Sequence, residues 1–193
     1  MTADPAPRPT PTEGRPAATG LFVTFEGGDG VGKTTQAALL EEWLTDAGRT
    51  VVRTREPGGT EVGVLIRDIV LHHRGEVVIQ DRYLDSSVAY QGAGRVLGRD
   101  EVRDLSLWAT EGLLPDVTVL LDLDPATARA RLDADDKPFD RLEAEKEHFH
   151  ARVRAEFLSL ADAEPGRFLV LDASRPADEL AAAVRERVQT LLR

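Results

Sequence analysis

Cysteine is absent from the 193 residues, and this excludes disulfide bonds, thiolate metal sites and cysteine nucleophiles. No apolar run is long enough to span a bilayer, so the sequence predicts no membrane segment. Basic residues are outnumbered by acidic ones, 24 to 34, and the formal net charge is −10. Because nucleic-acid backbones are bound chiefly through clustered Lys and Arg, this charge argues against a nucleic-acid partner. The lack of cysteine agrees with a cytoplasmic location.

Large apolar side chains are also nearly missing from residues 1–19, which contain five prolines. We expect a disordered Pro/Thr-rich tail or linker there, and not a secretion signal, because it has no apolar centre. Residues 20–193 are then expected to form a single domain. Since such tails often join domains, the chain is open to being one domain of a longer polypeptide.

Apolar runs typical of strands alternate with segments of helical periodicity after residue 20. The predicted strands are residues 21–26, 50–54, 77–80, 117–123 and 167–172. The predicted helices are residues 34–48, 60–73, 99–112, 143–163 and 176–192. This alternation predicts an α/β, doubly wound, five-stranded parallel sheet flanked by helices, with ligands at the carboxyl ends of the strands.

A glycine-rich motif, GGDGVGKT, follows the first strand and opens the first helix. It has the P-loop spacing, in which backbone N–H groups and the lysine surround phosphates and the hydroxyl faces Mg²⁺. The predicted ATP-binding residues are Gly27, Gly28, Asp29, Gly30, Val31, Gly32, Lys33 and Thr34. A P-loop alone leaves kinase, GTPase, motor and regulator open. No Asn-Lys-x-Asp motif occurs, and the third strand ends in Asp81-Arg82, which favours a small kinase.

Five segments carry a more specific likeness: FEGGDGVGKTTQ, TREPGGT, DRYLDSSVAYQGAGR, WATEGLLPDVTVLLDLDP and DRLEAEKEHFHARVRAEF. In this order they resemble the thymidylate kinase family of P-loop nucleoside monophosphate kinases. The resemblance implies transfer of the γ-phosphoryl group of ATP to dTMP, giving dTDP and ADP, with Mg²⁺ as cofactor. It also implies a homodimer.

Carried over residue by residue, the resemblance assigns Asp81 and Thr34 to Mg²⁺, directly or through water. Arg55 and Arg82 are expected to bind the acceptor phosphate, because planar guanidinium groups match phosphate oxygens in pairs. Asp29 is expected near the acceptor sugar hydroxyl.

The acceptor wall is expected after the third strand. Ser87 and Gln91 lie where the family recognises the thymine edge, and Tyr90 where the sugar lacks its 2′-hydroxyl; Ser86 belongs to the same wall. An ordinary helix cap or core contact is the alternative for Ser86, Ser87 and Tyr90.

A lid over ATP is expected at about residues 126–148, after the fourth strand. Lys33 is the one basic residue of the P-loop, so the lid is expected to supply an arginine to the transferring phosphoryl group. Arg141 is the first choice and Arg131 the second, with Arg129 and Lys137 also considered; a solvated helix face is the alternative. The predicted catalytic residues are thus Lys33, Asp81, Arg82, Arg141 and Arg131. The four histidines, His72, His73, His148 and His150, are interpreted as ordinary helix residues and not as metal ligands.

The sequence departs from the family pattern at Gly75, because the predicted strand that ends in Asp81 begins almost immediately after it. The family has a further helix here, which carries an aromatic residue and an arginine that contact thymine. Either the protein carries a true deletion, or the sequence lacks a segment that the intact protein has. The alternatives to a dTMP kinase are a kinase of another nucleoside monophosphate and a nucleotide-binding module without efficient dTMP turnover.

Overall fold

The structure, a computed structural model, describes residues 20–55, 76–93, 98–132 and 141–192, with Ala93, Leu132 and residues 141–146 described by their backbone alone. The predicted tail at 1–19, the helix predicted at 60–73 and the seam before Glu76 therefore lie wholly or partly outside the described residues. In the described part of the chain, no helix combines the length and the apolar character needed to cross a membrane.

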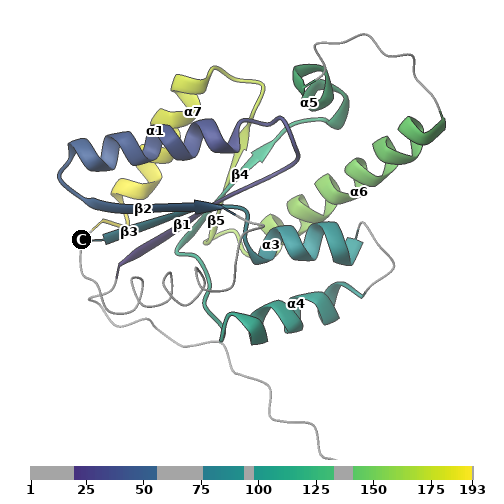
Figure 1. Ribbon diagram of the computed structural model, residues 1–193, viewed down its shortest axis with the longest axis horizontal. Coiled ribbons are helices and arrows are strands. Elements are labelled where there is room, and N and C mark those ends of the chain that lie inside the picture. The colour runs from purple at the N-terminus through teal and green to yellow at the C-terminus, as the bar shows by residue number, and fades with distance from the viewer. Residues whose placement is uncertain (1–19, 56–75, 94–97, 133–140, 193) are drawn as a thin grey trace, which may run out of the picture.

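A five-stranded sheet forms the centre of the molecule (Figure 1). Its strands are β1 (Leu21–Glu26), β2 (Thr50–Arg55), β3 (Glu76–Asp81), β4 (Val117–Asp122) and β5 (Phe168–Asp172). The spatial order is β2-β3-β1-β4-β5, and every pairing is parallel. The central strand β1 is buried along its whole length, including its polar residues Thr24 and Glu26. The predicted fold class is confirmed.

Helices cover both faces of this sheet. One face carries α1 (Lys33–Asp46) and α7 (Ala177–Gln189), which pack side by side in Figure 1. The other carries α3 (Leu84–Ser87), the π-helix η1 (Val88–Ala93), α4 (Arg99–Ala109) and α6 (Arg141–Ala163). The helix α5 (Pro125–Leu132) follows β4. The core is therefore divided by the sheet into two layers, each lined by apolar side chains.

The helix α1 begins and ends where the sequence has glycines. Gly32 precedes α1 with a φ of 97°, and Gly48 follows it with a φ of 76°, both in the left-handed region that favours glycine. The segments α3–η1 and α5 were not predicted. The first has only four α-helical residues before the π-helical turn, so it shows no sustained 3.6-residue periodicity. The second, PATARARL, has too few large apolar residues to show a buried face.

The strand register brings the carboxyl ends of three strands to one level. Phe25 of β1 is paired with Asp81 of β3, and Asp81 is paired with Arg55 of β2. Because parallel strands end at the same edge of the sheet, the residues that follow β1 and β3 meet there.

Candidate active site

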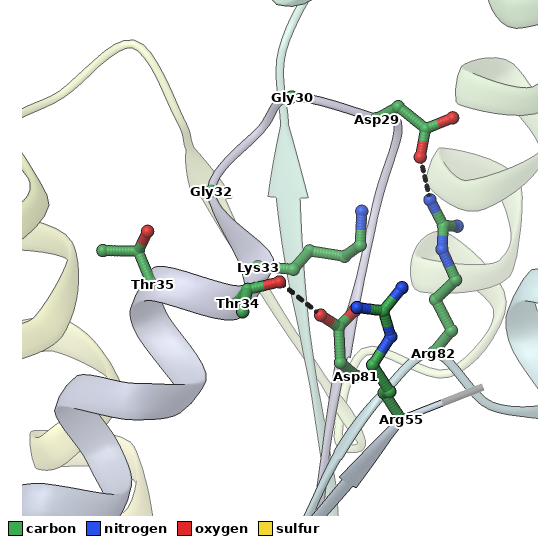
Figure 2. Close-up of a pocket in the computed structure, with 9 residues that line it drawn as sticks. All are labelled: Asp29, Gly30, Gly32, Lys33, Thr34, Thr35, Arg55, Asp81 and Arg82. Carbon is green, nitrogen blue, oxygen red and sulfur yellow. Dashed lines mark hydrogen bonds and ion pairs between the residues drawn. The ribbon is translucent and has the colours of Figure 1, made fainter. Parts of the chain in front are cut away.

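A cavity of about 330 Å³ opens at this edge of the sheet. It is lined by Asp29, Gly30, Gly32, Lys33, Thr34, Thr35, Arg55, Asp81 and Arg82, drawn in Figure 2. The P-loop, the end of β2 and the end of β3 all contribute, so segments far apart in the sequence converge on one space. We call this space the pocket. Most of the residues predicted to bind ATP, the acceptor phosphate and Mg²⁺ therefore share one pocket.

The P-loop backbone depends on its glycines for steric reasons. Gly27 has a φ of 131°, and a Cβ atom there would come within 2.5 Å of the Leu121 carbonyl oxygen on β4. No other residue type fits that approach without a shift of the strand. The first glycine of the motif thus lets the loop leave β1 against its neighbour β4.

Lys33 lies folded over the loop. Its Nζ donates hydrogen bonds to the Gly28 carbonyl oxygen at 2.6 Å and to the Gly27 carbonyl oxygen at 3.3 Å. Burial, followed by the nearby Arg82, lowers the pKa of the Lys33 ammonium to about 8. An anionic ligand in the pocket would reverse part of this effect, since phosphate oxygens favour the charged ammonium.

Thr34 and Asp81 are joined directly, and Figure 2 shows the contact. The Thr34 hydroxyl donates to Asp81 Oδ2 at 2.7 Å, which brings one hydroxyl and one carboxylate together beside the loop. Both are oxygen ligands of the kind that Mg²⁺ binds. The described residues hold no cluster of three or more His, Cys, Asp or Glu side chains that could bind a metal alone.

Arg82 has an unusual backbone conformation, and its side chain contacts several groups. Its φ of 68° lies in the left-handed region, which non-glycine residues seldom adopt. Nη2 pairs with Asp29 Oδ1 at 2.5 Å, while Nη1 donates to the Gly27 carbonyl oxygen at 3.3 Å. The guanidinium also lies 5.0 Å from the ring centre of Tyr90. Arg55 lies beside Asp81 in the same pocket, so the two arginines predicted for the acceptor phosphate come together (Figure 2).

The other residues predicted for the acceptor do not line the pocket. Ser86 is buried and donates its hydroxyl to Glu26 Oε2 at 2.5 Å, so it makes a structural contact, and its role at the acceptor stays a prediction. Tyr90 is half-buried against Phe149 and Phe157, and burial raises the pKa of its hydroxyl. Ser87 is half-buried and Gln91 is exposed.

The lid residues are only partly described. Lys137 lies outside the described residues, and Arg141 is described by its backbone at the start of α6. Arg131 is exposed on α5, and its Nη1 donates to the Ala173 carbonyl oxygen at 2.9 Å, after β5. It therefore joins helix α5 to the segment after β5 and does not line the pocket.

Three charged residues of the interior, Glu26, Asp85 and Arg167, were missed by the sequence predictions. Glu26, at the end of β1, is fully buried, and burial together with Asp85 raises the pKa of its carboxyl group to about 8. Arg167 makes two parallel hydrogen bonds to Asp85 at 2.7 and 2.9 Å. A carboxylate closing an apolar strand is a signal that could have found Glu26, as it found Asp81; nothing in the sequence around Arg167 indicates its partner.

Comparison with known proteins agrees with this geometry. The sequence model described as "Thymidylate kinase" matches residues 25–75 and 71–184, which together make up most of the chain. The chain belongs to the thymidylate kinase family. A thymidylate kinase of Leifsonia xyli is 61% identical over 88% of this chain and 94% of its own length. One from Clavibacter michiganensis is 59% identical over 90% and 97%, and one from Deinococcus radiodurans 48% over 86% and 94%.

The same comparisons bear on the seam at Gly75. The family match is split at residues 71–75, where the sequence departs from the family pattern. The Leifsonia alignment has 199 positions, but 88% of 193 residues is about 170, so about 29 positions carry no residue of this chain, more than a usual connection between elements. This number of positions is about the size of one helix with its loops.

Proposed function

We propose that this chain transfers the γ-phosphoryl group of ATP to dTMP, giving dTDP and ADP. The observation that carries the proposal is the convergence of Lys33, Arg55 and Arg82 on one pocket beside the paired Thr34 and Asp81. Relatives named thymidylate kinase, 48 to 61% identical, support dTMP as the acceptor.

ATP is bound from the P-loop side. The loop amides and the start of α1 face the phosphates, and Lys33 exchanges its contacts with the Gly27 and Gly28 carbonyl oxygens for phosphate oxygens. In-line transfer asks the protein mainly for positioning and charge neutralisation.

The acceptor phosphate is bound from the opposite side by Arg82 and Arg55. In the structure Arg82 is paired with Asp29, so a bound phosphate would share or take over this guanidinium. Asp29 is then positioned for a sugar hydroxyl. The attacking phosphate oxygen is already anionic at neutral pH, so no general base is required.

Mg²⁺ is the proposed cofactor, held by Thr34 and Asp81 directly or through water. The hydroxyl and carboxylate fit this ion, which keeps several waters and phosphate oxygens among its ligands. When bound, it would neutralise charge on the transferring phosphoryl group. Arg141 remains the first choice for the lid arginine and Arg131 the second.

A coupled assay of ADP formation across dTMP, dUMP, CMP and AMP tests the function. We expect dTMP to give the highest kcat/KM. Faster turnover of another monophosphate would favour a kinase of another nucleotide. This is the second candidate because the family residues that contact thymine are missing before Glu76. Nucleotide binding without ADP formation would contradict the kinase function and support a nucleotide-binding module.

The intact mass of the protein tests the seam. A mass near 21.1 kDa is expected if the deletion is true. A mass larger by about one helix with its loops would show a segment missing from the sequence.

A homodimer in the cytoplasm completes the proposal. On α4 the side chains of Leu105 and Trp108 are 63% and 69% exposed, and no α4 residue is buried within one chain. An exposed apolar helix face of this kind fits a partner copy. Sedimentation of the Trp108→Glu variant tests it: a wild-type dimer should become a monomer.

A further inference from the structure

The corner that carries Arg82 is held by Phe25 and Glu26 at the end of β1 and by Gly27, which follows the strand. The backbone N–H of Arg82 donates to the Phe25 carbonyl oxygen at 3.0 Å, and its side-chain Nη1 donates to the Gly27 carbonyl oxygen at 3.3 Å. Between these two acceptors lies Glu26. A residue with φ in the left-handed region persists only where its surroundings fix it.

Glu26 fixes the chain directly after Arg82. Its Oε1 accepts the backbone N–H of Tyr83 at 2.8 Å and that of Ser86 at 3.3 Å. The Tyr83 N–H precedes the first turn of α3, and the Ser86 N–H is shared between Glu26 and the Tyr83 carbonyl oxygen, at 3.0 Å from the latter. A side chain from β1 thus helps to cap the start of α3.

Glu26 is also linked to the Arg82 guanidinium through the Ser86 side chain. Its Oε2 is 2.5 Å from the Ser86 hydroxyl, and the same hydroxyl oxygen accepts Arg82 Nη1 at 3.2 Å. The buried carboxyl group of Glu26 therefore supports both the backbone turn at Arg82 and the position of its guanidinium group.

We propose that Glu26 is a positioning residue for the acceptor, which aims Arg82 at the acceptor phosphate. The inference rests on the proposed function, because that function assigns Arg82 to the phosphate. Glu26 does not line the pocket, so it acts through Arg82 and Ser86 and not on a nucleotide.

The position of Glu26 separates this role from a general structural one. None of its hydrogen bonds goes to Lys33 or Thr34, the side chains proposed to hold ATP and Mg²⁺. Loss of the carboxyl group should therefore weaken acceptor binding while ATP binding changes little. A purely structural role would lower stability and affect both substrates alike.

The test compares Glu26→Ala, Glu26→Gln and Asp116→Asn in the full chain. Asp116 Oδ2 accepts the Phe22 N–H at 2.7 Å, so it is a matched carboxyl-to-backbone contact near the opposite end of β1. We expect Glu26→Ala to raise the KM for dTMP about tenfold, the scale of one hydrogen bond to a charged group, with the KM for ATP within about twofold.

Glu26→Gln should restore the KM for dTMP to within about threefold of the wild type, because the amide oxygen accepts the same backbone N–H groups and the amide NH2 can donate to the Ser86 hydroxyl oxygen in place of the bond that Ser86 now donates. With its pKa raised to about 8, the native carboxyl group is mostly neutral at pH 7, as the amide is. Asp116→Asn should alter thermal stability but neither KM.

Three results would overturn the proposal: an unchanged KM for dTMP in a folded Glu26→Ala variant, equal rises for both substrates, or no rescue by glutamine. Titration calorimetry with dTMP provides a second reading if Glu26→Ala turns over too slowly. A wild-type chain that binds dTMP without forming ADP would overturn the proposed function, yet the calorimetric comparison would still decide the role of Glu26. A wild-type chain that does not bind dTMP would overturn both.

Discussion

Two arginine–carboxylate pairs start from the same motif, DRYLDSS, and lie in very different surroundings. The pocket pair joins Arg82 to Asp29, whose side chain is 59% exposed. The core pair joins Arg167 to Asp85, whose side chains are 9% and 1% exposed. The pocket pair has solvent and a cavity beside it, so a phosphate can replace its carboxylate. The core pair is closed off, so neither partner can be exchanged.

The core pair is also more fully bonded. Arg167 Nη1 donates to the Thr118 hydroxyl at 2.8 Å, and its Nε donates to Glu164 Oε2 at 2.8 Å. These contacts tie α3, β4 and the start of β5 together. One short motif thus places Arg82 beside an open cavity and Asp85 in the core, where it anchors α3.

Removing one partner of the core pair should have the largest effect. In Arg167→Met, Asp85 is left buried without its cation, and we expect the free energy of unfolding to fall by about 3–5 kcal/mol. Urea unfolding followed by circular dichroism measures it. The double variant Arg167→Met with Asp85→Leu should recover much of the loss, since both charges are then gone. Wild-type stability in the single variant would contradict the comparison.

Removing the arginine of the pocket pair should affect catalysis and not folding. We expect Arg82→Ala to lower kcat/KM for dTMP about 100-fold, because an anion-stabilising group is lost from the site. The melting temperature should stay near that of the wild type. Arg82→Lys is the matched control. Its kcat/KM for dTMP should lie between those of the wild type and Arg82→Ala, because lysine keeps the positive charge but lacks the planar guanidinium donors. Wild-type kinetics in Arg82→Ala would remove this residue from the acceptor site.

Glu26 lies between the two pairs and should make stability depend on pH. In the unfolded chain its carboxyl group loses its proton near pH 4.5, but in the fold only near pH 8. Between these values the unfolded state binds fewer protons, so a contribution fully present below about pH 4.5 is lost as pH rises towards 8. Glu26→Gln should remove this part of the slope, measured as melting temperature from pH 5 to 8. Equal slopes in the two proteins would contradict the burial of an ionisable Glu26.

The smallest effect is expected for a pair with the geometry of the core pair but without its burial. Arg154 makes two hydrogen bonds to Asp122, at 2.6 and 2.8 Å, with side chains 39% and 21% exposed. Water already solvates these charges, so Arg154→Ala should cost less than about 1 kcal/mol in urea unfolding. A cost equal to that of Arg167→Met would show that pairing geometry, and not burial, sets the difference.

The sequence was sufficient for the sheet and most of the pocket because those signals are local. The glycine spacing from Gly27 to Thr34 and the apolar strand before Asp81 are each contained in one short segment. The role of Glu26 could not be predicted in the same way, since its partners Tyr83 and Ser86 meet it only when β1 and β3 pair. The contact of Ser86 with Glu26 could not be predicted for the same reason, because the Ser86 motif points to the acceptor and its partner lies on another strand.

The pairing of Arg55 with Asp81 has a consequence for the length of the chain between β2 and β3. Their alignment is set by the residues of β2 and β3 themselves, so an insertion or deletion between the strands can leave the pairing unchanged. Connections tolerate changes in length far better than paired strands do. The pairing of Arg55 with Asp81 at the pocket should therefore tolerate a change in the length of the chain between the two strands.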